Sequence, residues 1–220
     1  MDKPSPAPGP ASRRSTVRRL PKRASYDPDV VFAILDAGVV AHVAFDHDGH
    51  PFVIPTVYVR VERELLIHGA AASRMLAVGA DGAPLSVCVT LLDGLVYARS
   101  AFHHSVNYRS VIVLGRAREV TDDAAKRRFL DALVDRVAPG RAAQVRGPSA
   151  KELAATRVLA MPIEEASAKI RTGGPVDDED DLRWPVWAGQ LPVGLRSMSH
   201  IPTPDDAPQY PTPARPLGVD

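Results

Sequence analysis

The segment LLIHGAAASRM (residues 65–75) combines the end of a strand with the start of a helix. An apolar run ends at His68, small residues follow at positions 69–72, and Ser73 and Arg74 open a short apolar stretch. Small side chains let a ligand approach the backbone, and a helix start offers unpaired N–H groups. Arg74 adds a forked, permanently charged donor. The segment therefore suits an anionic group such as a phosphate.

A second segment, NYRSVIVLGRARE (residues 107–119), has polar residues at the start of a strong strand pattern. Asn107, Arg109 and Ser110 precede the apolar run VIVLG, where their side chains could reach the same ligand. Taken singly, a serine before a helix is usually only a cap, and an arginine beside it is usually solvated. The two segments together, in this order, favour a bound phosphate.

Around these segments the chain reads as a series of strands joined by short turns. The expected strands are 39–45, 52–61, 64–70, 83–92, 95–101, 106–120, 157–163 and 166–172, in a fold of about seven strands. We expect turns at 47–49 and at Asp93-Gly94, each closing a hairpin. Hairpin connections imply antiparallel pairing, and closure into a barrel would remove exposed edges. The expected fold class is mainly β with flanking helices (α+β), an antiparallel split β-barrel.

Helix signals lie between these strands. Asp27 is a plausible cap with Pro28 in the first helical position, and Thr121 is the expected cap of a longer amphipathic helix that ends at Pro139-Gly140. A shorter helix is expected near Ser149 to Ala155. No strand and helix alternation of the doubly wound kind appears, so a Rossmann site is not expected.

Composition divides the chain into a central domain and two tails. Fifteen of the 21 prolines lie in residues 1–28 or 175–220. We expect a basic, Pro-rich and partly disordered N-terminal tail at 1–24, one domain at 25–195, and a Pro-rich C-terminal tail at 196–220. The net charge of +1 argues against a general nucleic-acid surface.

Several classes of function are not supported. The single cysteine, Cys88, permits no internal disulfide and no zinc cluster. No apolar run of ~18 residues is present for a membrane span, so we expect no membrane contact and a cytoplasmic protein. His103 and His104 are adjacent, and side chains of neighbouring strand residues point to opposite faces, so no metal site is expected there. No nucleophile and base pair with recognisable spacing supports hydrolysis.

The two quoted segments and the strands around them resemble the pyridoxamine 5'-phosphate oxidase-like family of FMN-binding split barrels, most closely its nitroimidazole-resistance-like branch. The resemblance covers roughly Val17 to Val193. It implies noncovalent FMN at the interface of a homodimer, and transfer of hydride or electrons to an unidentified small substrate. Reduced NAD(P)H is the expected electron donor, and the resemblance identifies no catalytic residue.

The resemblance also implies which residues contact the flavin. Ser73 and Arg74 fall on the family's phosphate-binding pair, and Met75 stands where the oxidases proper commonly have lysine, a loss for which Arg109 would compensate. No lysine lies in 51–64, and Tyr58 stands near the substrate position, which makes pyridoxamine phosphate oxidation doubtful. The implied cofactor-binding residues are Ile54, Pro55, Thr56, His68, Gly69, Ser73, Arg74, Arg109 and Ser110.

Two alternatives remain open, because one fold hosts many functions. One is a protein that binds or sequesters flavin or haem without turnover, with His68, His103 and His104 as candidate axial ligands. The other is a reductase that depends on the deazaflavin F420. Trp184 or Trp187 could cover a flavin ring, or anchor the C-terminal segment.

Overall fold

The fold is described for residues 8–195 of a computed structural model. Its helices are α1 (Pro28–Ala37), α2 (Arg74–Ala80), α3 (Asp123–Val137) and α4 (Ala150–Ala155). Its strands are β1 (Ala24–Ser25), β2 (Val40–His47), β3 (His50–Val61), β4 (Glu64–Ala70), β5 (Pro84–Tyr97), β6 (Ser105–Arg116), β7 (Arg118–Glu119), β8 (Thr156–Pro162), β9 (Glu165–Arg171) and β10 (Gly189–Pro192). Three of these ten strands, β1, β7 and β10, have four residues or fewer and account for most of the excess over the expected seven.

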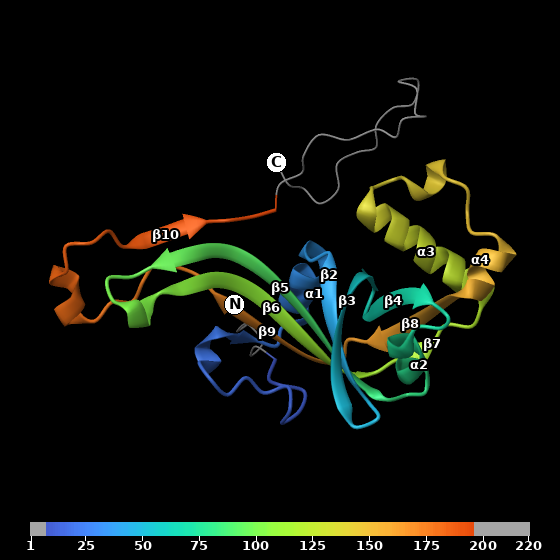
Figure 1. Cartoon of the computed structure of the whole chain (residues 1–220), viewed down its shortest axis with the longest axis horizontal. Helices are drawn as coiled ribbons and strands as arrows, with labels where there is room; N and C mark the ends of the chain where they lie inside the picture. Colours follow the sequence, from blue (N-terminus) through green and yellow to red (C-terminus); the bar gives the residue numbers. More distant parts are fainter. Residues whose placement is uncertain (1–7, 196–220) are drawn as a thin grey trace, which may run out of the picture.

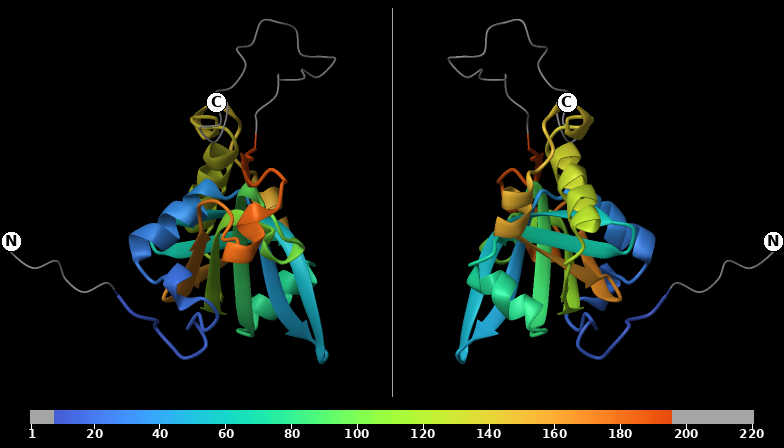
Figure 2. Two further views of the ribbon diagram at one scale, coloured as in Figure 1. Left: turned by 90° about the vertical axis from the view of Figure 1, so that its left-hand side faces the viewer. Right: turned by 90° about the vertical axis from the view of Figure 1, so that its right-hand side faces the viewer.

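Antiparallel pairing joins the strands in the order β1-β9-β6-β5-β2-β3-β4-β8-β7, with β10 beside β5. Strand β3 connects two halves of this sheet. Residues 50–57 pair with β2, whereas residues 58–61 pair with β4. Because one long strand belongs to both halves, the sheet curls around a shared interior (Figures 1 and 2). The expected split β-barrel class is confirmed.

The predicted first helix forms for the reasons visible in the sequence. Asp27 caps α1 by accepting a hydrogen bond from the backbone N–H of Asp29 at 2.9 Å, and Pro28 occupies its first turn. Its buried face consists of Val31, Ile34 and Leu35. The cap of α3 is Asp122, which accepts from the N–H of Ala125, and not Thr121 as expected.

The predicted hairpin turn at Asp93-Gly94 is wrong. Strand β5 runs through both residues, and its pairing with β6 only shifts register between Leu92 and Gly94. A Cβ on Gly94 would lie 3.1 Å from the carbonyl oxygen of Leu191, so this glycine lets β10 approach closely. The chain reverses later, at residues 98–104. Here η2 (Ala101–His103) forms a short 3₁₀ turn, so His103 and His104 do not lie in a strand.

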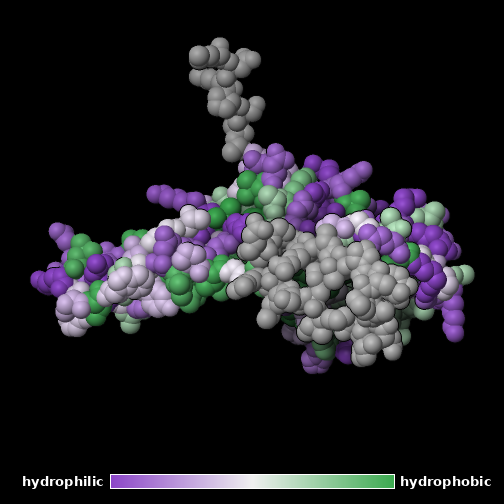
Figure 3. All heavy atoms as spheres, turned by 90° about the horizontal axis from the view of Figure 1, so that it is seen from above, coloured by the Kyte–Doolittle hydropathy of each residue, from purple (hydrophilic) through white to green (hydrophobic). Residues whose placement is uncertain are grey.

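The continuous β5 and β6 therefore form a long projecting arm, which we define as residues 92–108 with the segment 172–192 that lies along it (Figure 1). Strand β10 and the 3₁₀ turn η4 (Glu179–Arg183) belong to this segment. Hydrophobic residues are exposed on its surface (Figure 3), among them Phe102 at 89% and Trp187 at 69% exposure.

The described part of the predicted N-terminal tail, residues 8–24, packs on the domain. Ser15 is 3% exposed, and Arg14 forms an ion pair with Glu165 at the start of β9. Residues 1–7 and the predicted C-terminal tail at 196–220 lie outside the described residues. Within 8–195, every helix is too short or too polar to cross a membrane.

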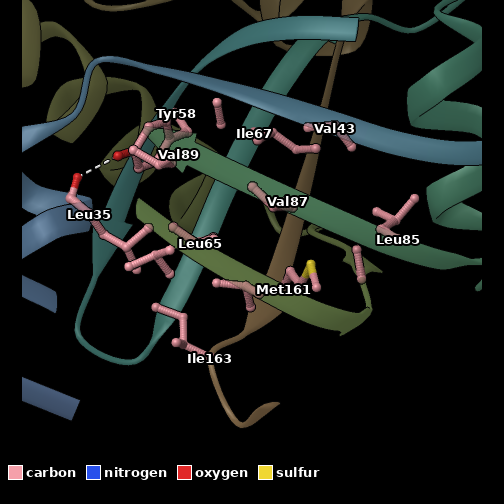
Figure 4. Packing of buried hydrophobic residues seen from close by; sticks show 14 of the residues in the cluster. Leu35, Val43, Tyr58, Leu65, Ile67, Leu85, Val87, Val89, Met161 and Ile163 are labelled. Atoms are coloured by element: carbon pink, nitrogen blue, oxygen red, sulfur yellow. Dashed lines mark hydrogen bonds between the residues drawn. The ribbon is translucent and has the colours of Figure 1, made fainter. Parts of the chain in front are cut away.

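The main core fills the barrel between β2, β3, β4, β5, β6 and α1. Tyr58 belongs to it and has no exposed surface, and its hydroxyl donates to the backbone carbonyl of Leu35 (Figure 4). A smaller cluster, which includes Leu66, Val158 and Phe129, packs α3 against the other face of β4 and β8. One face of β4 therefore packs in the main core, and the opposite face packs under α3.

Candidate functional site

The start of α2 presents the groups expected of an anion site. Ser73 is the N-cap, but its hydroxyl makes no capping hydrogen bond, so it is free to donate outward. Arg74 is exposed, and its guanidinium lies over the ring of Phe52 at 4.5 Å from the centroid. Aromatic stacking of this kind orients an arginine without neutralising its charge.

The charge of Arg74 is not neutralised by a neighbour. Within residues 8–195 it has no carboxylate partner, whereas Arg60 pairs with Asp36 and Arg118 pairs with Glu64. A cation that is oriented but unneutralised is available to an anionic ligand. Phe52, the residue that orients it, could not be found by sequence reasoning, because it lies 22 positions before Arg74 in the sequence.

Met75 and Gly69, which lie next to this site, serve the packing of α2 on the barrel. Met75, at the position where the oxidases have lysine, is 3% exposed and belongs to the main core. Gly69 faces α2, and a Cβ there would lie 3.1 Å from Leu76 Cδ1. The helix therefore packs closely on the end of β4, which fixes the position of Ser73 and Arg74.

His68 points away from this site. Side chains alternate along β4, so His68 shares the face of Leu66 under α3, while Gly69 shares the face of Ile67. Its ring packs edge-on against Phe129 at 6.1 Å, and within residues 8–195 its buried Nδ1 has no hydrogen-bond partner. Burial lowers the pKa of His68 below its ordinary value. The structure does not bring His68 and Arg74 together on one face.

We expect this burial to make stability depend on pH. Because the folded state keeps His68 neutral to a lower pH than the unfolded chain does, protons favour the unfolded state below about pH 6.5. The stability is present above that pH and is lost as the pH falls. The variant His68→Leu should lose less stability than the native chain between about pH 7.5 and about pH 5.5, measured by urea unfolding.

The exposed His42→Gln is the matched control and should keep the native pH dependence. An equal pH dependence in His68→Leu and in the native chain would show that His68 is not the group responsible.

The strand residues expected against a flavin divide between two faces of the sheet. Ile54 packs against the main core, and Thr56 pairs with the fully buried Ala41 on the same inner side. Pro55 lies on the outer face, in register with His42. Ser110 is also outside, and its hydroxyl donates to the carbonyl of Lys169 at 3.2 Å. Pro55 and Ser110 are therefore the members of this set that face outward.

Arg109 is not free to replace the missing lysine. Its guanidinium makes a two-point ion pair with Asp93, at 2.9 and 2.7 Å, and this carboxylate raises the pKa of Arg109. It lines an open groove of about 560 Å³ at the base of the arm, together with Ala37, Thr90, Leu91, Leu92, Asp93, Val193, Gly194 and Leu195.

Arg109 also lies far from Arg74 along the sheet. Phe52, under Arg74, pairs with Phe45, and the neighbouring Ala44 pairs with Ser86 of β5. Arg109 instead pairs with Leu91, five residues further along β5, or about 17 Å at ~3.3 Å per residue. Within one chain the two predicted cations do not form a single pocket.

A second group of candidate residues surrounds His104 on the arm. Its Nδ1 lies 2.9 Å from the carbonyl oxygen of Ser100, and its ring meets that of Tyr97 at 6.2 Å. Tyr97 in turn contacts Trp187 at 5.6 Å between centroids. Sequence reasoning singled out Trp187 and His104 separately. It did not single out Tyr97, because it predicted a turn at Asp93-Gly94 where β5 in fact continues.

Comparison with known proteins gives matches of different strength. A family model described as pyridoxamine 5'-phosphate oxidase matches residues 27–170. The chain is similar to the flavocytochrome Anf3 from Azotobacter vinelandii, with 41% identity and a TM-score of 0.89 over 94% of this chain and 96% of that one. It is also similar to the FAD and heme binding protein from Mycobacterium smegmatis, with 41% identity and a TM-score of 0.83 over 87% and 94%.

A protein from Bacteroides thetaiotaomicron assigned to 5-nitroimidazole antibiotic resistance is 18% identical, with a TM-score of 0.53 over 67% and 86% of the two chains. This likeness shows a shared fold alone. No curated protein matches the chain.

Proposed function

Because the chain belongs to the pyridoxamine 5'-phosphate oxidase family, whose model matches residues 27–170, we propose that it is a redox protein that binds both a flavin and a haem. The observation that carries this proposal is 41% identity over 94% of the chain to a protein named a flavocytochrome. A second relative at the same identity is named for FAD and haem. The name of this second relative favours FAD over the FMN that the sequence resemblance implied.

The residues at the start of α2 fit the phosphate end of a flavin nucleotide. Arg74 supplies an oriented cation without a carboxylate partner in residues 8–195, and Ser73 supplies a hydroxyl free of capping. A bound flavin supplies hydride and single-electron transfer, and the protein holds and orients it. NAD(P)H as the donor and a small oxidised molecule as the acceptor belong to the same proposal.

The flavin would lie between two copies of the chain. The outer face of the sheet exposes apolar side chains, with Val40 at 44%, Val53 at 62% and Ile112 at 41% exposure. The register places His42, Cys88 and Ile112 side by side on this face. In a two-fold dimer, this face of each copy would be covered by the other copy. The Arg74 of each copy would then lie against a surface of the other copy.

Of the candidate haem ligands, His104 fits best. Donation of its Nδ1–H to the Ser100 carbonyl would leave Nε2 with the free lone pair that an axial ligand requires. His68 packs under α3, and the Nε2 of His103 lies 3.2 Å from Asp178. Tyr97 and Trp187 add aromatic surface next to His104. A bound haem supplies one-electron chemistry at its iron.

The absorption spectrum of the purified chain, supplied with FAD and haem, tests the proposed function. We expect a flavin band that reductant bleaches and air restores, together with a Soret band. A chain that takes up only deazaflavin would support the alternative reductase. Haem and flavin that bind but cannot be reduced by NAD(P)H would support sequestration without turnover. Failure to take up either group would overturn the proposal.

The variant His104→Ala tests the proposed axial ligand. We expect its Soret band to shift or disappear while the flavin band is kept, because the two groups use different residues. His50→Ala, another exposed histidine, should leave both bands unchanged. An unaltered haem spectrum in His104→Ala would place the ligand elsewhere.

A further inference from the structure

The tip of the arm brings together three metal-ligating side chains from two distant segments. His103 ends the 3₁₀ turn between β5 and β6, while Asp178 and Asp181 belong to the turn η4. One ligand atom from each of the three lies within 4.8 Å of the others. His103 Nε2 and Asp178 Oδ2 are already 3.2 Å apart.

This spacing is close to that of a coordination shell. Ligand atoms about 2.1 Å from a tetrahedral ion are separated by about 3.4 Å, so the longest separation here closes with small side-chain rotations. Asp178 is 80% exposed on its side chain and free to adjust, whereas His103 is 21% exposed and held in place. Solvent access also leaves a position for water as a fourth ligand.

The charges at this tip also favour a cation. Two neighbouring carboxylates have arginine partners: Asp177 pairs with Arg99, and Asp180 pairs with Arg183. Asp178 and Asp181 have no arginine or lysine partner within residues 8–195, and they face a single imidazole. The two carboxylates supply negative charge at this tip, which a divalent ion would balance.

We propose that His103, Asp178 and Asp181 bind one divalent transition-metal ion of the Zn²⁺ class, which fastens η4 to the tip of the β5–β6 hairpin. An imidazole nitrogen selects against Ca²⁺ and Mg²⁺, which prefer oxygen ligands alone. His103 and His104 were not expected to bind one metal ion as an adjacent pair, and the proposed site uses only His103. This proposal does not depend on flavin or haem binding.

The two tryptophans of the chain report on this site directly. Trp184 and Trp187 follow Asp181 by three and six residues, and no other tryptophan is present in the sequence. We expect Zn²⁺ to bind the purified full chain at one ion per chain in calorimetry, with a saturable change in tryptophan fluorescence at the same concentration. Ca²⁺ at equal concentration should produce neither signal.

Each of His103→Ala and Asp181→Asn should weaken Zn²⁺ binding at least ~10-fold. The matched control is Asp180→Asn, which removes an equally acidic neighbour and should bind Zn²⁺ as the native chain does. Circular dichroism at far-ultraviolet wavelengths checks that the variants fold. Zn²⁺ binding of equal strength in all three variants, Ca²⁺ binding as tight as Zn²⁺ binding, or no Zn²⁺ binding by the native chain would each overturn the proposal.

Discussion

Replacing Tyr58 by alanine is expected to lower the free energy of unfolding by about 3–5 kcal/mol. The side chain has no exposed surface and fills the centre of the barrel between α1 and β5. A Cβ on Gly38 would lie only 2.7 Å from the Tyr58 hydroxyl, and 2.5 Å from a methyl group of Val89, which shows how closely this region is packed. Truncation would leave a cavity that such a region cannot easily fill.

The position of Tyr58 in β3 adds to this effect. It is the first residue of β3 to pair with β4, at the point where the strand passes from one half of the sheet to the other. Burial raises the pKa of Tyr58, so the hydroxyl stays neutral and keeps donating to the Leu35 carbonyl. Its loss would loosen the contact of α1 with both halves.

Urea unfolding followed by circular dichroism measures the loss. Tyr58→Phe removes only the hydrogen bond and should cost about 1–2 kcal/mol, because it strands one buried carbonyl. Val61→Ala, on the same strand but 40% exposed, should change stability by less than about 0.5 kcal/mol. If Tyr58→Ala costs less than about 1 kcal/mol, the barrel interior is not as tightly packed as the structure describes.

The burial of Tyr58 also explains why β3 has no lysine near the substrate position. The resemblance placed Tyr58 near the substrate position of pyridoxamine phosphate oxidases, but the side chain points inward and is fully buried. A lysine there would place an unpaired charge in the core. This chain uses the position for packing, and the expectation that pyridoxamine phosphate oxidation is doubtful stays a prediction.

The elements that sequence predicts well are those defined by local chemistry. Asp27 and Pro28 start α1, and the alternating residues of β2 and β3 flank a turn at Asp48-Gly49, within the predicted 47–49. Asp93-Gly94 shows the limit of such reasoning. An Asp-Gly pair suits a turn and also suits a bulge, and the outcome here depends on the pairing of Gly94 with β10, almost 100 residues later. Local sequence carries no information about that partner.

The candidate site shows the same division. Ser73 and Arg74 are found from sequence because a helix start has a local signature, and the structure places them at the start of α2. The alternation of side chains along β4 is sufficient to place His68 and Gly69 on opposite faces, whereas the family resemblance grouped both as flavin contacts. The neutralisation of Arg109 by Asp93 could not be foreseen, because it depends on the strand continuing where a turn was expected.

Removing the charge at Arg74 is expected to weaken flavin nucleotide binding by about 1.5–3 kcal/mol, the usual contribution of a hydrogen bond to a charged group. This corresponds to about a 10-fold to 150-fold rise in the dissociation constant. The reason is that Arg74 is oriented by Phe52 and has no carboxylate partner in residues 8–195, so a bound phosphate would lose its main cation. The change in dissociation constant is measured by titrating the flavin with Arg74→Ala or with the native chain and following the quenching of flavin fluorescence.

Two comparisons make this measurement specific to the phosphate. Riboflavin has the same ring but no phosphate, so Arg74→Ala should weaken FAD and FMN binding while leaving riboflavin affinity nearly unchanged. Arg63→Ala is a matched control, because Arg63 also lies over a phenylalanine ring, that of Phe32 at 5.5 Å, on a different part of the barrel. The native affinity for the nucleotides should also fall with added salt, and that dependence should be smaller in Arg74→Ala. An equal loss for riboflavin and the nucleotides would mean that Arg74 supports the fold of the site without gripping the phosphate, and unchanged affinity would place the phosphate elsewhere.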